Sequence, residues 1–130
     1  MSFLGLKTGD LVPPITRGPI TTRHLVEYAG ASLDFNRIHY DEPFARAGGH
    51  ASVIAHGMLS MAFFGQMAAA LGGRITALSA RFRAVTYPGD VVRVEGQVAA
   101  VTDDTVELKL VAYRSDGTVT LEGSATVAAS

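Results

Sequence analysis

The stretch Gly57-Met58-Leu59-Ser60-Met61-Ala62-Phe63-Phe64-Gly65-Gln66-Met67-Ala68-Ala69-Ala70-Leu71 decides the fold. Its apolar side chains fall on nearly every face of a helix roughly 22 Å long. A helix that is apolar all round is a buried helix, so other elements must wrap around it. The run is too short to span a bilayer. We therefore expect a central helix inside a globular domain.

The second half of the chain supplies strands for that wrapping. Apolar and polar residues alternate with a period of two over 105–112 and again over 118–127, as in half-buried strands. Asp116-Gly117 between them predicts a two-residue hairpin turn. Further strands are expected over 75–86 and 92–98. Near the start, the prolines of Val12-Pro13-Pro14-Ile15 favour an extended segment.

Two short helices are expected ahead of the central one. Thr21 or Thr22 caps the first, and Gly30 stands just past its end. Asp41-Glu42-Pro43 starts the second, which ends at Gly48-Gly49.

The fold class expected from these patterns is α+β, with residues 1–130 forming one domain. A curved antiparallel sheet of about five strands closes around the central helix. A single open sheet leaves an edge strand unpaired, so we expect a dimer formed edge to edge.

The composition limits the classes of function. Eleven Lys and Arg against twelve Asp and Glu give a net charge of −1, so no strong field attracts nucleic acid or an anionic membrane. The absence of cysteine excludes disulfides, thiolate zinc sites and cysteine nucleophiles. The first ten residues lack the pattern of a secretory signal. We expect a soluble cytoplasmic protein without a nucleic-acid or membrane partner.

Asp34 and His39 are the first candidates for chemistry. In an irregular loop, a carboxylate and an imidazole five residues apart can converge on one water molecule. The carboxylate accepts a proton while the imidazole orients and polarises the water, as addition or removal of water requires. The same spacing also fits an ordinary hydrogen bond that stabilises a loop.

His56-Gly57 is the second candidate, at the start of the central helix. A glycine in the first turn lets a ligand approach backbone N–H groups that have no partner within the helix. These donors suit a carbonyl oxygen that gains negative charge. The alternative is that Gly57 permits a tight turn into the helix and His56 caps it.

Three segments form a recognisable set. They are Tyr-Ala-Gly-Ala-Ser-Leu-Asp-Phe-Asn-Arg-Ile-His-Tyr-Asp over 28–41, Ala-His-Gly-Met-Leu over 55–59, and Arg-Phe-Arg-Ala-Val-Thr-Tyr-Pro-Gly-Asp over 81–90. They resemble, respectively, the hydratase motif, the start of the central helix and the signature turn of the MaoC-like family of (R)-specific enoyl-thioester hydratases and dehydratases. Within that family the chain is most similar to the catalytic subunit of mycobacterial-type heterodimeric 3-hydroxyacyl-carrier-protein dehydratases.

The resemblance implies a hot-dog fold and roles for individual residues. Asp34 and His39 would activate the water that adds to C3 of a trans-2-enoyl thioester, or remove the hydroxyl group of an (R)-3-hydroxyacyl thioester. The N–H of Gly57 would bind the thioester carbonyl. Asn36, which would also shape the loop, and His56 complete the predicted substrate-binding set. No metal or redox cofactor is implied, because the thioester acidifies the adjacent carbon. The substrate would be carried on coenzyme A or phosphopantetheine, and the partner would be a second copy or a related hot-dog subunit.

The chain departs from the family pattern at three positions. Leu33 replaces the usual glycine before the aspartate, and Arg37 replaces the usual proline after the asparagine. Leu33 removes backbone freedom, while Arg37, which we expect to face the surface, would lower the proton affinity of His39 if it pointed inward. Gly65 stands where some members carry a serine.

Other interpretations of the sequence stay open. Asp34, His39, His50 and His56 include metal-ligand types but lack the close spacing of helix-borne zinc motifs. Arg81 and Arg83 suit either the phosphates of a carrier or a solvated strand face, and His24 is expected to be exposed without a partner. The small residues Gly65, Ala68, Ala69 and Ala70 leave space for an acyl chain or allow close packing. The rival functions are an acyl-thioester hydrolase and a non-catalytic acyl-binding subunit.

Overall fold

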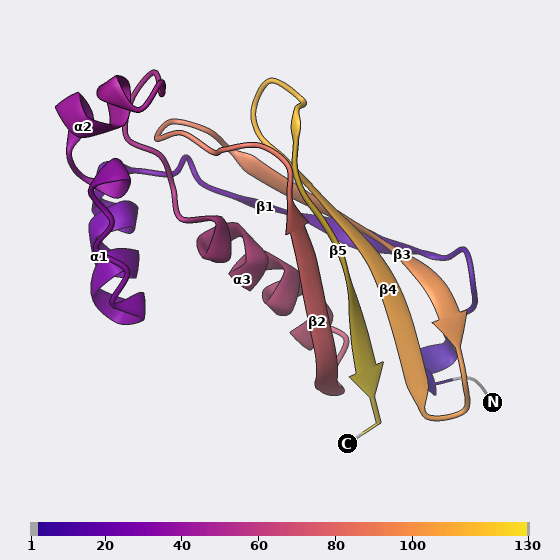
Figure 1. The fold of residues 1–130 in the computed structure, drawn as a ribbon. Helices are drawn as coiled ribbons and strands as arrows, with labels where there is room; N and C mark the ends of the chain where they lie inside the picture. Colours follow the sequence, from indigo (N-terminus) through magenta and orange to yellow (C-terminus); the bar gives the residue numbers. More distant parts are fainter. Residues whose placement is uncertain (1–2, 130) are drawn as a thin grey trace.

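The computed structural model describes residues 3–129. Five strands form one antiparallel sheet in the spatial order β1-β3-β4-β5-β2 (Figure 1). In chain order the elements are the 3₁₀ turn η1 (Phe3–Gly5), β1 (Leu11–Arg17), α1 (Thr22–Ser32), the 3₁₀ turn η2 (Arg37–His39), α2 (Glu42–Ala47), α3 (Gly57–Ala69), β2 (Arg74–Phe82), β3 (Val92–Val101), β4 (Thr105–Tyr113) and β5 (Val119–Ala128). This arrangement confirms the expected α+β architecture.

The core lies between α3 and one face of the sheet (Figure 1). The alternation of β3 and β4 places valines and leucines on this inner face, and Phe63, Phe64 and Met67 of α3 pack against them. The central strands are therefore predicted correctly from their period of two.

The helix α3 begins at Gly57 as expected but is not buried all round. It ends at Ala69, and its outward side remains open: Met58 is 53% exposed, and Ala62, Gln66 and Ala69 are also exposed. A five-stranded sheet curves around only one side of a helix. The expectation that other elements of this chain surround the helix on all sides is therefore wrong. The sheet leaves the outward side of α3 uncovered.

The two edge strands differ from their sequence-based outlines. The prolines of β1 lie in an edge strand with a register shift between Val12 and Ile15, where missing N–H groups are tolerated. The strand β2 ends at Phe82 and does not continue to residue 86, although Arg83 N still donates to Thr120 O. The β4–β5 connection spans residues 114–118, so the predicted two-residue turn is too short. Gly117, at φ 85°, occupies the left-handed position of this longer hairpin loop.

The segment from α1 to α2 lies beside the N-terminal end of α3 (Figure 1). Asp41 Oδ1 accepts from Phe44 N at the start of α2, and Gly48 follows its end, as predicted. The polar loop between α1 and α2 is thereby held against the first turn of the central helix. No helix within residues 3–129 is both long and apolar enough to cross a membrane.

Candidate active site

The helix α1 ends in a strained residue that directs the chain into the site. Thr21 Oγ1 accepts from His24 N, while His24 Nδ1 accepts from Thr21 N, so His24 is exposed but has a partner, contrary to expectation. The helix does not stop at Gly30; it runs to Ser32, and Leu33 follows it with φ 60°. Left-handed backbone costs a residue with a side chain about 1–2 kcal/mol, which explains why glycine suits this position.

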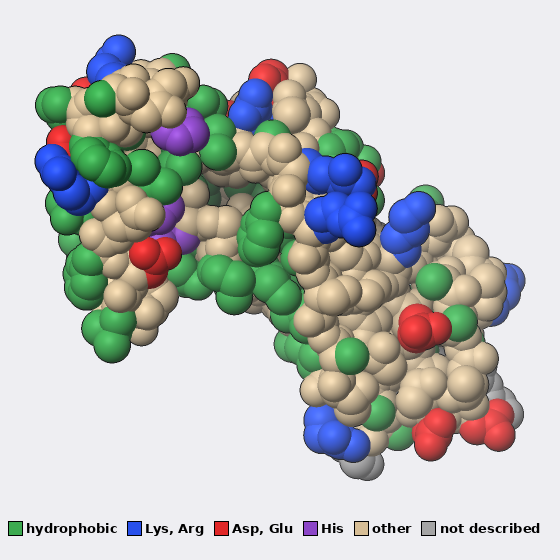
Figure 2. All heavy atoms as spheres, in the orientation of Figure 1, with side chains coloured by type: hydrophobic (Ala, Val, Ile, Leu, Met, Phe, Trp, Pro, Cys, Tyr) green, Lys and Arg blue, Asp and Glu red, His purple; other side chains and the backbone are tan. Residues whose placement is uncertain are grey.

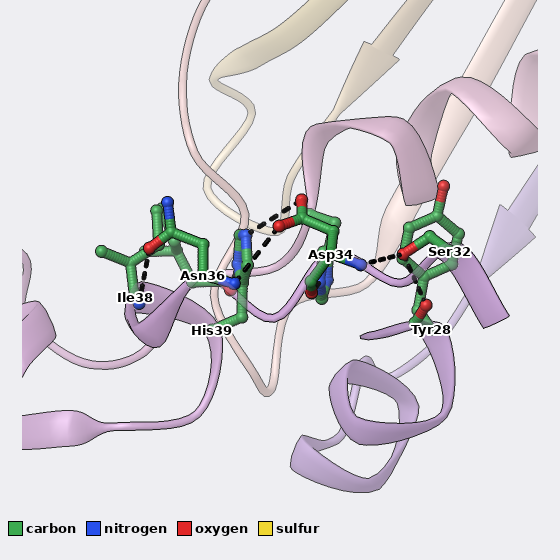
Figure 3. A network of polar contacts seen from close by, with 8 residues as sticks. Tyr28, Ser32, Asp34, Asn36, Ile38 and His39 are labelled. Carbon is green, nitrogen blue, oxygen red and sulfur yellow. Dashed lines mark hydrogen bonds and ion pairs between the residues drawn. The ribbon is translucent and has the colours of Figure 1, made fainter. Parts of the chain in front are cut away.

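Asn36 shapes the loop that carries Asp34. Its side-chain oxygen accepts from Ile38 N at 3.1 Å and caps η2, while Asp34 Oδ1 accepts from Asn36 N at 3.3 Å (Figure 3). These two bonds bring the chain round so that His39 lies opposite Asp34. The structure therefore places Asn36 in a loop-shaping position, outside the set of residues that line the nearby pocket.

The tautomer of His39 follows from its hydrogen bond. Its Nδ1 lies 2.7 Å from the carbonyl oxygen of Ile54, which can only accept, so Nδ1 carries the proton. The other ring nitrogen, Nε2, faces Asp34 Oδ2 at 3.8 Å (Figure 3). In the neutral ring both of these facing atoms are acceptors.

Burial lowers the pKa of His39 from its ordinary value of 6.5, and the neighbouring His56 lowers it further. The bond to Ile54 and the Asp34 carboxylate raise it, but burial is the largest cause and the pKa remains lowered. The side chain of His39 is 8% exposed, whereas that of Asp34 is 52% exposed. The neutral imidazole is therefore favoured, beside a carboxylate that solvent can reach.

The separation of the two side chains suits a single water molecule that lies beside both atoms and bridges them. A separation of 3.8 Å is too long for a direct hydrogen bond, and two acceptors cannot bond to each other. A water between them can donate one hydrogen to each and direct its oxygen lone pairs elsewhere. This arrangement can remove a proton from a water while the oxygen attacks.

Gly57 lines the same pocket as His39. As the first residue of α3, its N–H has no acceptor within the helix. A Cβ at this position would lie 2.7 Å from the ring of Phe82, so glycine leaves room for the ring where it lies.

A pocket of about 470 Å³ is lined by both His39 and Gly57, whereas Asp34 lies beside His39 and is not itself a lining residue. The pocket is bordered by His39, His56, Gly57, Met58 and Phe82, with further lining by Ile38, Ile54, Ala55, Ser60, Arg83, Ala84, Val85, Thr86 and Leu121. Figure 2 shows a hollow between the lobe that carries histidine side chains and the sheet, with hydrophobic side chains along it. Gly65, Ala68, Ala69 and Ala70 do not line this pocket, and Ala68 is fully buried in the core.

His56 lies where the sequence placed it but makes different contacts. It occupies the N-cap position of α3 without a side-chain cap, so the capping interpretation is wrong. It is 2% exposed, its Nε2 lies 3.0 Å from the carbonyl oxygen of Asp34, and its ring stacks on His39 at 3.6 Å between centroids. Its ring nitrogens are thus turned into the protein.

Asp34, His39 and His56 each offer a potential metal-ligand atom within 4.8 Å of the others. The rings of His39 and His56 are tilted by only 20° to each other, so their in-plane lone pairs run side by side and do not converge on one ion. His50 lies outside this group. The geometry fits a bridging water better than a metal ion.

The two basic features singled out in the sequence face outward. Arg37 forms an ion pair with Asp41 at 2.8 Å and its guanidinium stacks over Phe44, so it points away from His39 as expected. Arg83 pairs with Glu122 at 2.9 Å and borders the pocket, while Arg81 is exposed.

Sequence reasoning missed the contacts that orient the site. The Ile54 carbonyl is a main-chain group and leaves no residue-type signal. Phe82 belongs to the segment 81–90 that resembles the family's signature turn, but its position over Gly57 depends on where β2 ends. Tyr28 begins the segment 28–41, and the sequence gives no sign that its ring lies 4.9 Å from that of His56.

Comparison with known proteins places this chain in a family. Residues 9–120 match the family described as MaoC like domain. The (R)-specific enoyl-CoA hydratase of Rhodospirillum rubrum is 35% identical over 111 residues, which cover 77% of this chain and 73% of that protein.

Solved structures agree with this assignment. The (R)-hydratase from A. caviae involved in PHA biosynthesis superposes with a TM-score of 0.86 and 26% identity, over 97% of this chain and 98% of that one. A chain of the ChsH1-ChsH2 complex from Mycobacterium tuberculosis shares the fold with a TM-score of 0.85 and 20% identity, over 95% and 98% of the two chains. The expected hot-dog fold is confirmed, and the chain belongs to the MaoC-like domain family and is a hydro-lyase of the hydratase and dehydratase type.

Proposed function

We propose that this protein reversibly hydrates trans-2-enoyl thioesters to (R)-3-hydroxyacyl thioesters, with Asp34 and His39 as the catalytic residues. The observation that carries this proposal is the pair of acceptors, His39 Nε2 and Asp34 Oδ2, 3.8 Å apart with the tautomer of His39 set by Ile54. The R stereochemistry comes from the similarity to a hydratase named for it.

In the hydration direction, the water held by the pair forms its new bond to C3 of the substrate. One of its protons passes to the pair as the oxygen attacks. The electrons of the C2–C3 double bond shift towards the thioester, and C2 then takes a proton from the same pair. The reaction thus adds one water across the double bond and returns both side chains to their starting states. Dehydration follows the same steps in reverse.

Gly57 is the proposed donor to the thioester carbonyl. Negative charge builds on that oxygen as water adds, and a fixed N–H at the positive end of α3 stabilises it. The thioester itself supplies the electron withdrawal, so the proposed reaction uses no metal or redox cofactor. Its carrier would be coenzyme A or phosphopantetheine.

A second hot-dog subunit, identical or related, is the proposed partner. The strand β2 pairs with β5 on one side and forms an edge of the sheet on the other, and the outward side of α3 is apolar and exposed at Met58 and Ala62. A similar chain is solved as part of a two-component complex. Pairing along β2 would cover both features.

The direct test is to follow the ultraviolet absorbance of the conjugated enoyl group with short, medium and long enoyl thioesters. We expect loss of the absorbance without release of free thiol, and chiral analysis of the product should give the R form. Thiol release in place of hydration would indicate a thioesterase. No turnover by the purified chain, together with turnover after addition of a related subunit, would indicate an accessory role.

The matched variants are Asp34→Asn and His39→Gln, which keep the approximate shape of each side chain. Each should lower kcat by on the order of a hundredfold or more if the pair provides acid–base catalysis. His50→Gln, a half-buried histidine outside the site, serves as the control. Full hydration activity in both site variants would contradict the proposed roles.

A further inference from the structure

We propose that His56 is a positioning residue that holds Asp34 by its main chain and His39 by its ring face, and so sets the separation of the two catalytic side chains. This inference rests on the proposed function, and it gives His56 a role different from the substrate contact expected from the sequence.

The first step is the direction of the hydrogen bond made by His56. A carbonyl oxygen can only accept, so the 3.0 Å contact to Asp34 O requires the proton to be on Nε2. The remaining nitrogen, Nδ1, is buried and has no hydrogen-bond partner among the described residues. The Nε2 donor of His56 is thereby aimed at the main chain of Asp34.

The second step is how little else fixes the loop. Within the described part of the chain, the hydrogen bonds of residues 33–36 run to near neighbours, namely Ser32, Asp34, Ile38 and His39. The bond from His56 to Asp34 joins residues 22 positions apart and connects this loop to α3. Ile54 anchors the same loop further along, at Ile38 and His39, so the bond from His56 is the long-range link made at Asp34 itself.

The third step is the stack between the two imidazoles. The rings of His39 and His56 lie 3.6 Å apart between centroids and are nearly parallel, which fixes the plane of His39 from one side. The Ile54 carbonyl fixes the same ring through Nδ1. His39 is thus constrained in both tilt and rotation, and its Nε2 has one direction in which to point.

The fourth step connects the pair to the helix. His56 directly precedes Gly57 in the chain, so the residue that holds Asp34 and His39 is covalently attached to the proposed carbonyl donor. The positions of Asp34, His39 and the Gly57 N–H are therefore all set relative to His56. Small displacements matter in such sites, since a misplacement of about 1 Å can cost roughly a hundredfold in rate.

Three variants separate the two contacts of His56. His56→Phe keeps a flat ring that can stack and removes the donor. His56→Gln removes the ring but can place an amide N–H near the position of Nε2. His56→Asn also removes the ring, and its shorter amide cannot reach Asp34 O.

We expect His56→Phe and His56→Asn to lower kcat by on the order of ten- to a hundredfold, with KM within about twofold of the parent value, because the proposed role of His56 is to position the catalytic pair for the chemical step. His56→Gln should retain more kcat than His56→Asn. Circular dichroism and thermal melts identify any variant that fails to fold. If His56→Phe does not fold, the comparison of Gln with Asn still decides the matter.

A double variant distinguishes this inference from the proposed function. In an Asp34→Asn background, His56→Phe should add little further loss, because the geometry it protects no longer supports the reaction. Three outcomes would overturn the positioning role while leaving the proposed function intact. They are wild-type kcat in folded His56→Phe, equal kcat in His56→Gln and His56→Asn, and full additivity of His56→Phe with Asp34→Asn. Full activity of Asp34→Asn itself would instead overturn the proposed function.

Discussion

Ile54 determines which nitrogen of His39 faces Asp34. Its carbonyl oxygen accepts the Nδ1 proton at 2.7 Å, and the bare Nε2 is left 3.8 Å from Asp34 Oδ2. The Ile54 segment is itself anchored, because Ile54 N donates to Ile38 O one residue before His39. A catalytic loop and the segment leading into α3 therefore fix each other.

The first prediction concerns the pH dependence of activity and stability. Burial lowers the pKa of His39 in the folded state, and hydration needs the neutral ring, so activity should fall on the acid side with a midpoint below the ordinary histidine value of 6.5. The unfolded chain binds a proton at a higher pH than the folded one. This contribution to stability is therefore complete above the unfolded pKa and is lost as the pH falls through the folded pKa.

Thermal melts of the parent and of His39→Gln across this range check the sign. The unfolding free energy of the parent minus that of His39→Gln should increase with pH between the folded and the unfolded pKa of His39, because only the parent gains stability through this histidine as the pH rises. The histidines outside the site contribute equally to both proteins. A parent whose stability falls relative to the variant as the pH rises would show that the pKa of His39 is raised.

The elements that the sequence predicted well are those with an internal repeat. The β3 and β4 alternation and the apolar run of α3 identify a sheet packed on a helix, because burial of one face imposes a period on the sequence. The apolar outer side of α3 misled the same reasoning. Met58 and Ala62 on this side are exposed in this chain. The sequence pattern shows which helix faces are apolar, but it does not show what covers each face.

The site was only partly predictable. Asp34, His39 and Gly57 stand out by residue type and by their place in a motif, and the structure places His39 and Gly57 in the lining of one pocket, with Asp34 beside His39. The contacts that orient them involve the carbonyls of Ile54 and Asp34, and every residue has a carbonyl. Such contacts depend on how distant segments meet, which a single sequence does not encode locally.

The end of α1 gives the second prediction. Gly30 lies inside the helix, and a methyl group added to its Cα would meet no atom within 4 Å, whereas Leu33 carries the left-handed backbone. Gly30→Ala should therefore stabilise the protein by about 1 kcal/mol through helix propensity. Leu33→Gly should also stabilise it, by about 0.5–1 kcal/mol, because relief of the left-handed backbone outweighs the entropy of glycine.

Chemical denaturation of both single variants measures these changes. If Gly30 were the left-handed residue that the sequence suggested, alanine there would destabilise the protein instead. If both Gly30→Ala and Leu33→Gly increase the free energy of unfolding, the helix ends after Ser32 and not at Gly30.

The third prediction concerns Arg37, the cation that replaces the family's proline. Its guanidinium is engaged by Asp41 and Phe44 and points away from the pocket. Arg37→Ala should leave kcat and KM for an enoyl thioester unchanged. The hydrogen bond from Arg37 lowers the pKa of Asp41, so the variant should lose some stability above the ordinary carboxyl pKa and little at lower pH. A shifted pH profile of activity in Arg37→Ala would show that the cation acts on His39.

The fourth prediction tests the close approach of Phe82 to Gly57. A Cβ on residue 57 would lie 2.7 Å from the Phe82 ring, which is tighter than van der Waals contact, and it would also stand over the N–H proposed to bind the thioester. Phe82 is 52% exposed, so its ring can swing outward and the fold should survive Gly57→Ala. We expect a melting temperature within a few degrees of the parent and a fall in kcat/KM.

Adding Phe82→Ala should remove the clash with the ring and recover part of the loss if the displaced ring obstructs the pocket. If kcat/KM is not recovered at all, the methyl group itself blocks the carbonyl from the helix N-terminus. Unchanged kcat/KM in Gly57→Ala would mean that the substrate carbonyl binds elsewhere.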